Sequence, residues 1–402
     1  MKVLVFSSLY PNNMWPWHGV FVKERMTHFA RLTGCDIKVV APVPYYPPIK
    51  LGFRRQFSQV VAQETIEDIE VYHPRYFMTP KVGMTLYGWM MFLSVLPKVK
   101  ALKQQYPFDI IDAHFVYPDG FAATLLGRVL QTPVVVSARG NDVLYYSQLA
   151  TIRPLLRRTL RDARHAIAVS QELKDGMIRL GASTDKVTVI PNGVDSGKFH
   201  NIPQAEARKK LGLPPKKTIL SVGHLIHRKG FDRLLIALKN ICAERPHQEL
   251  QVIIAGEGDL RRELEQTIAS FGLAERVCLP GRIAHQDLAF WYSAADVFCL
   301  LSRQEGCPNV VLESLACGTP VVATPVGEVP AILASDQVGL LAQPSEHDIT
   351  KQLIRALDTP WSRDAIRTYA KSYTWERVSH RVGQVFASAL AAKSIPTFRP
   401  AS

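Results

Sequence analysis

The chain has 402 residues, of which 47% are hydrophobic and 21% are charged, and its formal net charge is +13. This length predicts two domains, and the composition is typical of folded globular proteins rather than disordered ones. In residues 1–200, 24 lysine and arginine residues face 15 acidic ones, which favours an anionic partner: nucleic acid, a phosphorylated substrate or an anionic lipid surface. The six cysteines show no C-x-x-C pair or zinc spacing, so we expect a cytoplasmic protein without disulfides.

Apolar strands alternate with helical segments through the first half of the chain. The predicted strands and helices occupy residues 3–8, 20–32, 37–42, 108–114, 121–131, 133–138, 164–170, 171–181 and 186–195. The most hydrophobic window, residues 82–96, is shorter than the about 20 residues that a spanning helix needs, so it predicts a core or membrane-surface helix. Nearly continuous apolar strands separated by helices indicate a parallel sheet that is covered on both faces.

The same alternation restarts after a polar, proline-containing stretch at residues 200–217. Residues 361–392 have helical periodicity, and the aromatic pair Tyr373 and Trp375 within them needs a surface to cover. We therefore predict two doubly wound α/β domains in series. Ligands of such sheets bind where strands end and helices begin, and the default site is the cleft between the domains.

Residues 302–324 combine a strand exit, a turn, two carboxylates and a helix entry. Glu305 lies on the loop before a helix predicted at residues 308–317, and Glu313 lies within this otherwise apolar helix. The first backbone amides of the helix lack intrahelical partners and favour an anion. Two glutamates could be ordinary surface charges, but in an apolar helix and beside an anion site they are expected to have partners such as sugar hydroxyls.

Residues 305–324, EGCPNVVLESLACGTPVVAT, resemble the E-x7-E signature of retaining nucleotide-sugar enzymes of glycosyltransferase family 4, and the resemblance extends over almost the whole chain. It implies a GT-B fold, with two Rossmann-like domains facing across a cleft and a C-terminal helix that crosses back. Residues 1–198 would bind the acceptor and residues 199–374 the nucleotide sugar. Residues 375–402 would form the helix on the N-terminal domain and a tail.

The resemblance also assigns roles to residues of the second half. Glu305 would approach the donor sugar and leaving phosphate, Glu313 would bind the ribose hydroxyls, and Arg228 and Lys229 would stabilise the departing diphosphate. The helix start, Pro308, Asn309, Val310 and Val311, would hold the diphosphate, and Arg282 would lie near the nucleobase. His224 stands where the family usually has arginine, so phosphate binding there could be weaker or pH-sensitive.

The first half supplies further candidates by the same resemblance. His114 ends a strand and matches the family's cleft histidine, which contacts the transferred sugar, although a lone histidine after a strand is more often structural. Gly19 matches an N-terminal glycine whose amide approaches the diphosphate. Arg139 and Asp142, in a loop that could simply be a turn, are acceptor candidates. Arginines at 153, 157, 161 and 164 share one helix face, which is either a solvated surface or a docking face for phosphates.

The resemblance implies transfer of a sugar from a nucleoside-diphosphate sugar to an acceptor hydroxyl, with retained configuration, in bacterial polysaccharide or glycolipid biosynthesis. A UDP-sugar is preferred to a GDP-sugar, and the acceptor would be a saccharide or lipid-linked. No D-x-D motif occurs, so neither a metal nor a cofactor is expected, and no nucleic-acid module is present. We expect a cytoplasmic enzyme, peripheral at the inner face of the plasma membrane. The alternatives are a nucleotide-sugar 2-epimerase of this fold and a non-enzymatic sugar-nucleotide or nucleic-acid binder.

Overall fold

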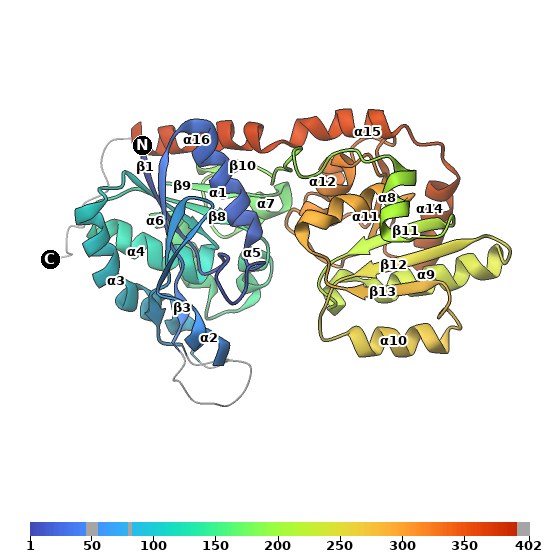
Figure 1. Ribbon diagram of the computed structural model, residues 1–402. Helices are drawn as coiled ribbons and strands as arrows, with labels where there is room; N and C mark the ends of the chain where they lie inside the picture. The colour runs from blue at the N-terminus through green and yellow to red at the C-terminus, as the bar shows by residue number, and fades with distance from the viewer. Residues whose placement is uncertain (46–54, 79–82, 392–402) are drawn as a thin grey trace. The chain divides into compact units, whose positions relative to one another are not determined.

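The computed structural model describes residues 1–45, 55–78 and 83–391 (Figure 1), so the predicted tail from residue 392 and the first residue of the 82–96 window lie outside the described residues. The chain divides into two compact units. The first comprises Met1–Asn192 and the C-terminal stretch from Trp375, and the second comprises Gly193–Thr374. Among the described residues, no helix combines the length and the apolar character needed to cross a membrane.

The first unit is built on an eight-stranded sheet with the order β10-β9-β8-β7-β1-β2-β5-β4. The pairings are parallel except that of β4 with β5. The strands are β1 (Lys2–Phe6), β2 (Asp36–Val40), β4 (Gln63–Ile66), β5 (Ile69–Tyr72), β7 (Ile110–His114), β8 (Val134–Ala138), β9 (His165–Ala168) and β10 (Val187–Val189), beside a small pair of β3 (Val43–Pro44) and β6 (Arg75–Tyr76).

Helices cover the sheet of the first unit, as the alternating pattern predicted. They are α1 (Val20–Thr33), α2 (Arg55–Gln59), α3 (Tyr87–Gln105), α4 (Phe121–Val129), α5 (Asn141–Leu144), α6 (Arg153–Asp162), α7 (Gln171–Arg179) and α16 (Trp375–Ala391). Right-handed connections put α4 and α6 on the face opposite to α1. The strand β7 at the centre of the sheet is fully buried, and its end therefore brings His114 into the interior.

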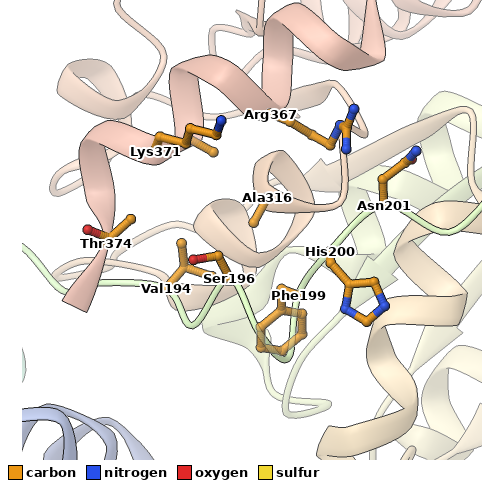
Figure 2. Close-up of a pocket in the computed structure, with 10 residues that line it drawn as sticks. Val194, Ser196, Phe199, His200, Asn201, Ala316, Arg367, Lys371 and Thr374 are labelled. Atoms are coloured by element: carbon orange, nitrogen blue, oxygen red, sulfur yellow. The ribbon is translucent and has the colours of Figure 1, made fainter. Parts of the chain in front are cut away.

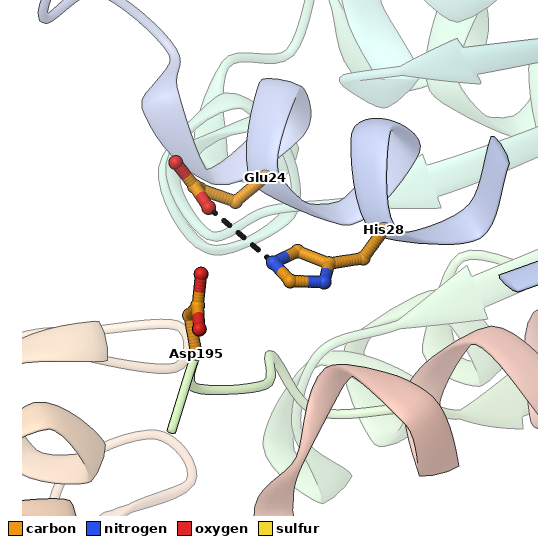
Figure 3. A group of neighbouring side chains, drawn as sticks. All are labelled: Glu24, His28 and Asp195. Atoms are coloured by element: carbon orange, nitrogen blue, oxygen red, sulfur yellow. Dashed lines mark ion pairs between the residues drawn. The ribbon is translucent and has the colours of Figure 1, made fainter. Parts of the chain in front are cut away.

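The C-terminal helix α16 returns to the first unit and packs on α1, which confirms the predicted crossing back of this helix. Trp375 is buried and stacks on His28 with ring centroids 5.9 Å apart, and Phe386 meets Phe29 edge-on at 5.3 Å. His28 also pairs with Glu24 one turn earlier on α1, with Nε2 and Oε2 3.7 Å apart (Figure 3). The predicted single helix over 361–392 is interrupted, because a short turn at residues 371–373 separates α16 from α15.

The second unit contains a six-stranded, all-parallel sheet with the order β13-β12-β11-β14-β15-β16. Its strands are β11 (Lys217–Val222), β12 (Leu250–Ala255), β13 (Val277–Gly281), β14 (Val297–Leu300), β15 (Val321–Ala323) and β16 (Gly339–Leu341). Its helices are α8 (Gln204–Leu211), α9 (Phe231–Glu244), α10 (Arg261–Ser270), α11 (Leu288–Ala294), α12 (Asn309–Ala316), α13 (Val329–Ile332), α14 (Glu346–Asp358) and α15 (Arg363–Ala370). In this strand order, β11 and β14 are neighbours, so the loops that follow them meet.

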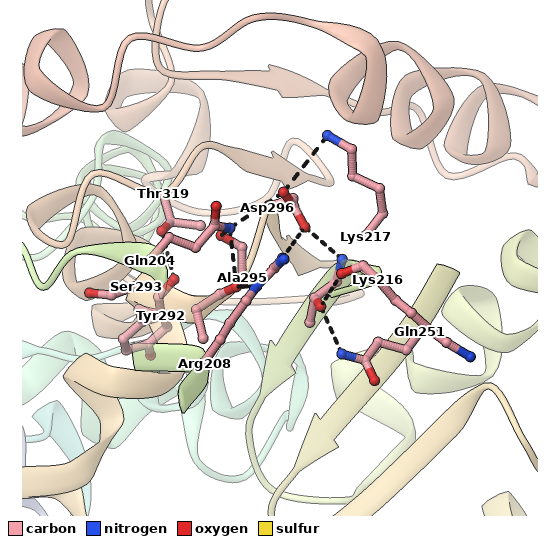
Figure 4. A network of polar contacts seen from close by, with 12 residues as sticks. Gln204, Arg208, Lys216, Lys217, Gln251, Tyr292, Ser293, Ala295, Asp296 and Thr319 are labelled. Atoms are coloured by element: carbon pink, nitrogen blue, oxygen red, sulfur yellow. Dashed lines mark hydrogen bonds and ion pairs between the residues drawn. The ribbon is translucent and has the colours of Figure 1, made fainter. Parts of the chain in front are cut away.

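A polar network fixes α8 to the beginnings of β11 and β14, the two central strands of this sheet (Figure 4). Oδ2 of Asp296 accepts hydrogen bonds from Nη2 of Arg208 and from the Thr218 backbone amide, both at 2.7 Å. Nε of Arg208 donates to the Ala294 carbonyl at 3.0 Å. Because Asp296 immediately precedes β14 and Thr218 lies on β11, the network ties the beginnings of the two strands whose opposite ends carry the candidate site.

Candidate functional site

Glu305 and Lys229 form a close ion pair in the second unit. Nζ of Lys229, in the 3-10 turn His227–Lys229 after β11, lies 2.6 Å from Oε1 of Glu305 in the loop after β14. The side chains are 15% and 8% exposed, so little water screens the pair. The Ser302 hydroxyl donates to the same Glu305 oxygen at 2.7 Å, and Nη1 of Arg228 lies 4.0 Å from Oε2. Three of the predicted site residues thus meet in one place.

The two loops that carry this pair are joined by a backbone hydrogen bond and by the Arg228 side chain. The Arg303 amide donates to the Arg228 carbonyl at 2.8 Å, and Nη1 of Arg228 donates to the Gln304 carbonyl at 3.3 Å. Gly230 has a φ of +70°, and a Cβ there would lie 2.0 Å from the Leu301 carbonyl oxygen. A side chain at this position would push the turn that holds Lys229 away from the loop that holds Glu305.

The start of α12 is also as predicted, but one of its amides is engaged. Pro308 precedes the helix and gives it no side-chain cap, and the first turn carries no acidic residue at the positive end of the helix dipole. The Val311 amide donates to the Pro308 carbonyl at 3.1 Å. An anion at this helix start would therefore compete with that bond for the Val311 donor.

Glu313 is buried within α12, and the structure gives it two partners that the sequence did not predict. The Tyr292 hydroxyl donates to Oε2 at 2.8 Å, and Nε2 of His285 lies 3.4 Å from Oε1. Burial, together with the Glu313 charge, raises the pKa of Tyr292 well above its usual value, so this phenol stays a donor. His285 is 40% exposed and packs edge-on against Phe199, whereas the Glu313 side chain beside it is only 8% exposed.

His224 and Arg282 come together at one residue, Glu257, which follows β12. Nδ1 of His224 lies 2.7 Å from the Glu257 carbonyl oxygen, and Nη2 of Arg282 lies 3.2 Å from Oε2 of the same residue. Glu257 was not among the predicted site residues. Its position between two glycines, Gly256 and Gly258, is the signal that could have revealed it, because such a loop indicates close backbone approach.

In the first unit, His114 is enclosed by charged neighbours and has no exposed surface. Nη2 of Arg139 lies 2.5 Å from Nδ1, and Oδ2 of Asp112 lies 3.0 Å from Nε2. A guanidinium can only donate, so Nδ1 accepts and the imidazole proton resides on Nε2, where it is donated to Asp112. Burial, followed by the Arg139 and Arg25 charges, lowers the pKa of His114 to about 4. The ring is therefore neutral at pH 7, with both nitrogens engaged.

Asp142 and Gly19, two other predicted residues of the first unit, contact the backbone in this structure. Oδ2 of Asp142 accepts from the Val116 amide at 2.9 Å, and Oδ1 accepts from the Gly140 amide at 2.8 Å. Asp142 thus holds the loop after β7 and the loop after β8 together. Gly19 has a φ of +64°, and a Cβ there would lie 2.2 Å from the Leu9 carbonyl oxygen, which explains the need for glycine just before α1.

A separate pocket of about 180 Å³ lies in the second unit, where the chain enters and leaves it (Figure 2). Phe199, Ala316, Arg367, Lys371 and Thr374 are among its lining residues. None of the predicted site residues lines this pocket.

In comparison with known proteins, two family models match successive parts of the chain. Residues 57–198 match the model described as Glycosyltransferase Family 4, and residues 203–373 match the model described as Glycosyl transferases group 1. Together the two matches span most of the sequence.

Relatives and solved structures agree with these matches. The chain is 28% identical to the putative teichuronic acid biosynthesis glycosyltransferase TuaC of Bacillus subtilis, over 88% of this chain and 89% of that protein. It is also 28% identical to the alpha-monoglucosyldiacylglycerol synthase of Streptococcus pneumoniae, over 65% of this chain and 61% of that protein. The structure of Anabaena HepE in complex with UDP superposes with a TM-score of 0.72 at 20% identity, over 96% of this chain and 100% of HepE.

The likeness to HepE shows the fold, which is of the predicted GT-B class: two parallel-sheet α/β domains. The family matches agree with the E-x7-E motif at Glu305 and Glu313 and with the basic turn at Arg228 and Lys229. The chain belongs to glycosyltransferase family 4 and is a glycosyltransferase.

Proposed function

We propose that this enzyme transfers a sugar from a nucleoside-diphosphate sugar to an acceptor hydroxyl, with retention of configuration and without a metal ion. The observation that carries the proposal is the buried Lys229–Glu305 pair beside the start of α12. A lysine and an arginine at a helix start provide the positive charge that a departing diphosphate requires. The carboxylate beside them provides a hydrogen-bond acceptor for sugar hydroxyls.

In this proposal the second unit binds the donor and the first unit binds the acceptor. Lys229, Arg228 and the amides at the start of α12 stabilise the diphosphate, while Glu305 orients the sugar. Glu313, held by Tyr292, accepts hydrogen bonds from the ribose. We assign no protein nucleophile: the acceptor hydroxyl attacks from the face that the diphosphate leaves, and a departing phosphate oxygen takes its proton.

His114, Arg139 and Asp142 have a supporting role in the same proposal. Because both ring nitrogens of His114 are engaged, we propose that it acts by fixing Arg139 and the backbone around it, unless a substrate displaces one partner. Gly19 would let the chain after β1 approach the donor. His224 and Arg282, which meet at Glu257, would border the nucleobase.

Among donors, we propose a UDP-sugar before a GDP-sugar, since HepE was solved with UDP and with UDP-glucose. For the acceptor we propose a saccharide or a lipid-linked saccharide, in agreement with the names of TuaC and of the glucosyldiacylglycerol synthase. The same relatives support a role in cell-surface polysaccharide or glycolipid formation. A lipid-linked acceptor would be met at a membrane surface, so the proposal includes peripheral association with an anionic membrane.

Thermal stabilisation by a panel of sugar nucleotides tests the donor assignment. A ligand at one hundred times its Kd should stabilise the protein by about 2.7 kcal/mol. We expect a UDP-sugar to raise the Tm of the wild-type protein and of Glu263→Gln, a control on the solvent-facing side of α10, and to leave that of Glu313→Gln nearly unchanged. Equal shifts in both variants would contradict the assignment of Glu313.

Product analysis then separates the alternatives. With donor and acceptor present and EDTA added, we expect an unchanged transfer rate and a product with the anomeric configuration of the donor sugar, read by NMR. Conversion of the donor in the absence of any acceptor would instead indicate a 2-epimerase. Salt-dependent DNA binding without donor turnover would indicate a binder, and inverted configuration or loss of activity with EDTA would refute the proposed mechanism.

A further inference from the structure

The outward side of α3 is apolar. Leu93 is 64% exposed and Leu86, which directly precedes the helix, is 49% exposed, while Trp89 and Met90 between them are partly exposed. Spacings of three and four residues place these four side chains along one face of the helix. The opposite side of α3 is buried, through residues such as Met91 and Val95. A contiguous apolar strip thus faces solvent in this unit.

The helices around this strip carry a large excess of positive charge. The three helices α3, α4 and α6 carry a single acidic residue, Asp162. They carry eight basic residues, which are Lys98, Lys100, Lys103, Arg128, Arg153, Arg157, Arg158 and Arg161. Asp162 lies within 4 Å of three arginines, Arg128 at 2.7 Å, Arg161 at 3.1 Å and Arg158 at 3.6 Å. One carboxylate cannot neutralise this group, so the surface remains cationic. Arg157 and Arg161 are exposed, and the Arg161 side chain is 74% exposed.

The apolar strip and the arginines are joined by direct contacts. The Arg158 guanidinium lies 5.4 Å from the centroid of the Trp89 ring and 5.6 Å from that of Phe121. Trp89 and Phe121 meet edge-on at 5.3 Å. In sequence, residues 86–93 and residues 153–161 are far apart, but α3 packs on α4 and α4 packs on α6 (Figure 1). They therefore form one composite face, which we call the α3–α6 surface.

We infer that the α3–α6 surface docks on an anionic lipid bilayer. The leucines and Trp89 enter the boundary between headgroups and acyl chains, and the arginines of α6 bind lipid phosphates as charge-assisted donors. The pairing of exposed leucines with a cationic margin favours this occupant, because a nucleic acid would use the charge but offers nothing for aliphatic side chains to enter. The inference rests on the membrane association proposed above and is independent of the donor chemistry.

Flotation of the full-length protein with phosphatidylcholine vesicles, with and without phosphatidylglycerol, tests the inference. We expect binding that requires the anionic lipid. Arg157→Ala/Arg161→Ala should weaken binding by about 30-fold, since each basic residue near such a surface contributes about 1 kcal/mol. Leu86→Ser/Leu93→Ser should weaken it by roughly 10-fold or more through the lost apolar burial.

Matched controls use comparable residues elsewhere. Lys209→Ala/Arg262→Ala removes two exposed basic residues of the second unit, and Leu390→Ser removes a leucine of α16 that is 40% exposed. Both should bind as the wild-type protein does. Absence of wild-type binding, or equal binding by the test variants and the controls, would overturn the inference.

Two further outcomes are decisive. If the arginine pair abolished binding and the leucine pair did not alter it, the surface would be purely electrostatic and suited to an acidic protein or polymer, and bilayer docking would be overturned. Donor-induced thermal stabilisation is measured on the same proteins. Retained stabilisation in variants that no longer bind vesicles would separate a failure of docking from a failure of the proposed donor site.

Discussion

Replacing Lys229 by alanine should reduce stability as well as abolish activity. Nζ of Lys229 lies 2.6 Å from Oε1 of Glu305, and the two side chains are 15% and 8% exposed. After the substitution, the largely buried carboxylate keeps the Ser302 hydroxyl at 2.7 Å, but the nearest cation is Arg228 at 4.0 Å. Removing one partner of a buried pair costs about 3–5 kcal/mol. Because Ser302 and Arg228 remain, we expect roughly 3 kcal/mol.

A double substitution distinguishes the pair from a general effect of losing a lysine. Glu305→Gln removes the charge that Lys229→Ala would strand, so the combined variant should be roughly 2 kcal/mol more stable than Lys229→Ala alone. Urea unfolding at pH 7, with both singles and the double, gives the coupling free energy. Transfer activity should remain absent in all three, since the charges act on the donor as well as on each other.

Arg245→Ala is the matched control. Arg245 pairs with Asp358 at 2.8 Å, but the side chains are 35% and 53% exposed, so its loss should cost less than about 1 kcal/mol. If Lys229→Ala were as stable as Arg245→Ala, or if Glu305→Gln did not restore stability to it, the electrostatic description of the site would be refuted.

Three further predictions concern two positions in the second unit and one in the first. Gly327→Ala should lower transfer activity, because φ is +58° and a Cβ would lie 2.6 Å from the Glu305 carbonyl oxygen; kinetics near wild type would contradict this. Tyr292→Phe leaves buried Glu313 without its 2.8 Å donor and should cost about 1–3 kcal/mol in urea unfolding, together with weaker nucleotide binding. Burial raises the pKa of Asp119 to about 7 from 3.8, so the folded state binds the extra proton between these values and stability falls as pH rises from 4 to 7. Asp119→Asn should remove this loss, which is on the order of 4 kcal/mol. If the free energy of unfolding fell equally between pH 4 and pH 7 in the variant and in the wild type, this prediction would be refuted.

The sequence predicted the architecture well, since strand and helix periodicities are local. The helix expected at residues 308–317 is α12, Asn309–Ala316, and the C-terminal helix does cover the first unit. Strand order is a different kind of information. The contact between Lys229 and Glu305 exists because β11 lies beside β14, and nothing in the residues between them specifies that neighbour.

The buried hydrogen-bond partners of Glu313 and His114 were not predicted from the sequence. Tyr292 and His285 reach Glu313 from elements that carry no recognisable motif, so periodicity alone could not find them. Asp112 could have been predicted as a partner of His114, because residues two apart on a strand share a face. The prediction that His114 faces the cleft did not consider this carboxylate, and the structure buries both side chains completely.

The donor capacity of Lys229 explains how a lysine already paired with a carboxylate can also serve a diphosphate. An ammonium has three N–H donors, and the pair with Glu305 uses one of them. The Glu305 bond fixes where the other donors point before any donor sugar arrives, and a fixed charge needs no reorganisation when the leaving group becomes negative. In Lys229→Arg, the planar guanidinium would bind the carboxylate through two parallel N–H donors, and these two donors would then be unavailable to the diphosphate. On this reasoning Lys229→Arg keeps the charge and much of the stability but transfers slowly, so a fully active Lys229→Arg enzyme would mean that charge alone, and not its placement, is what the site requires.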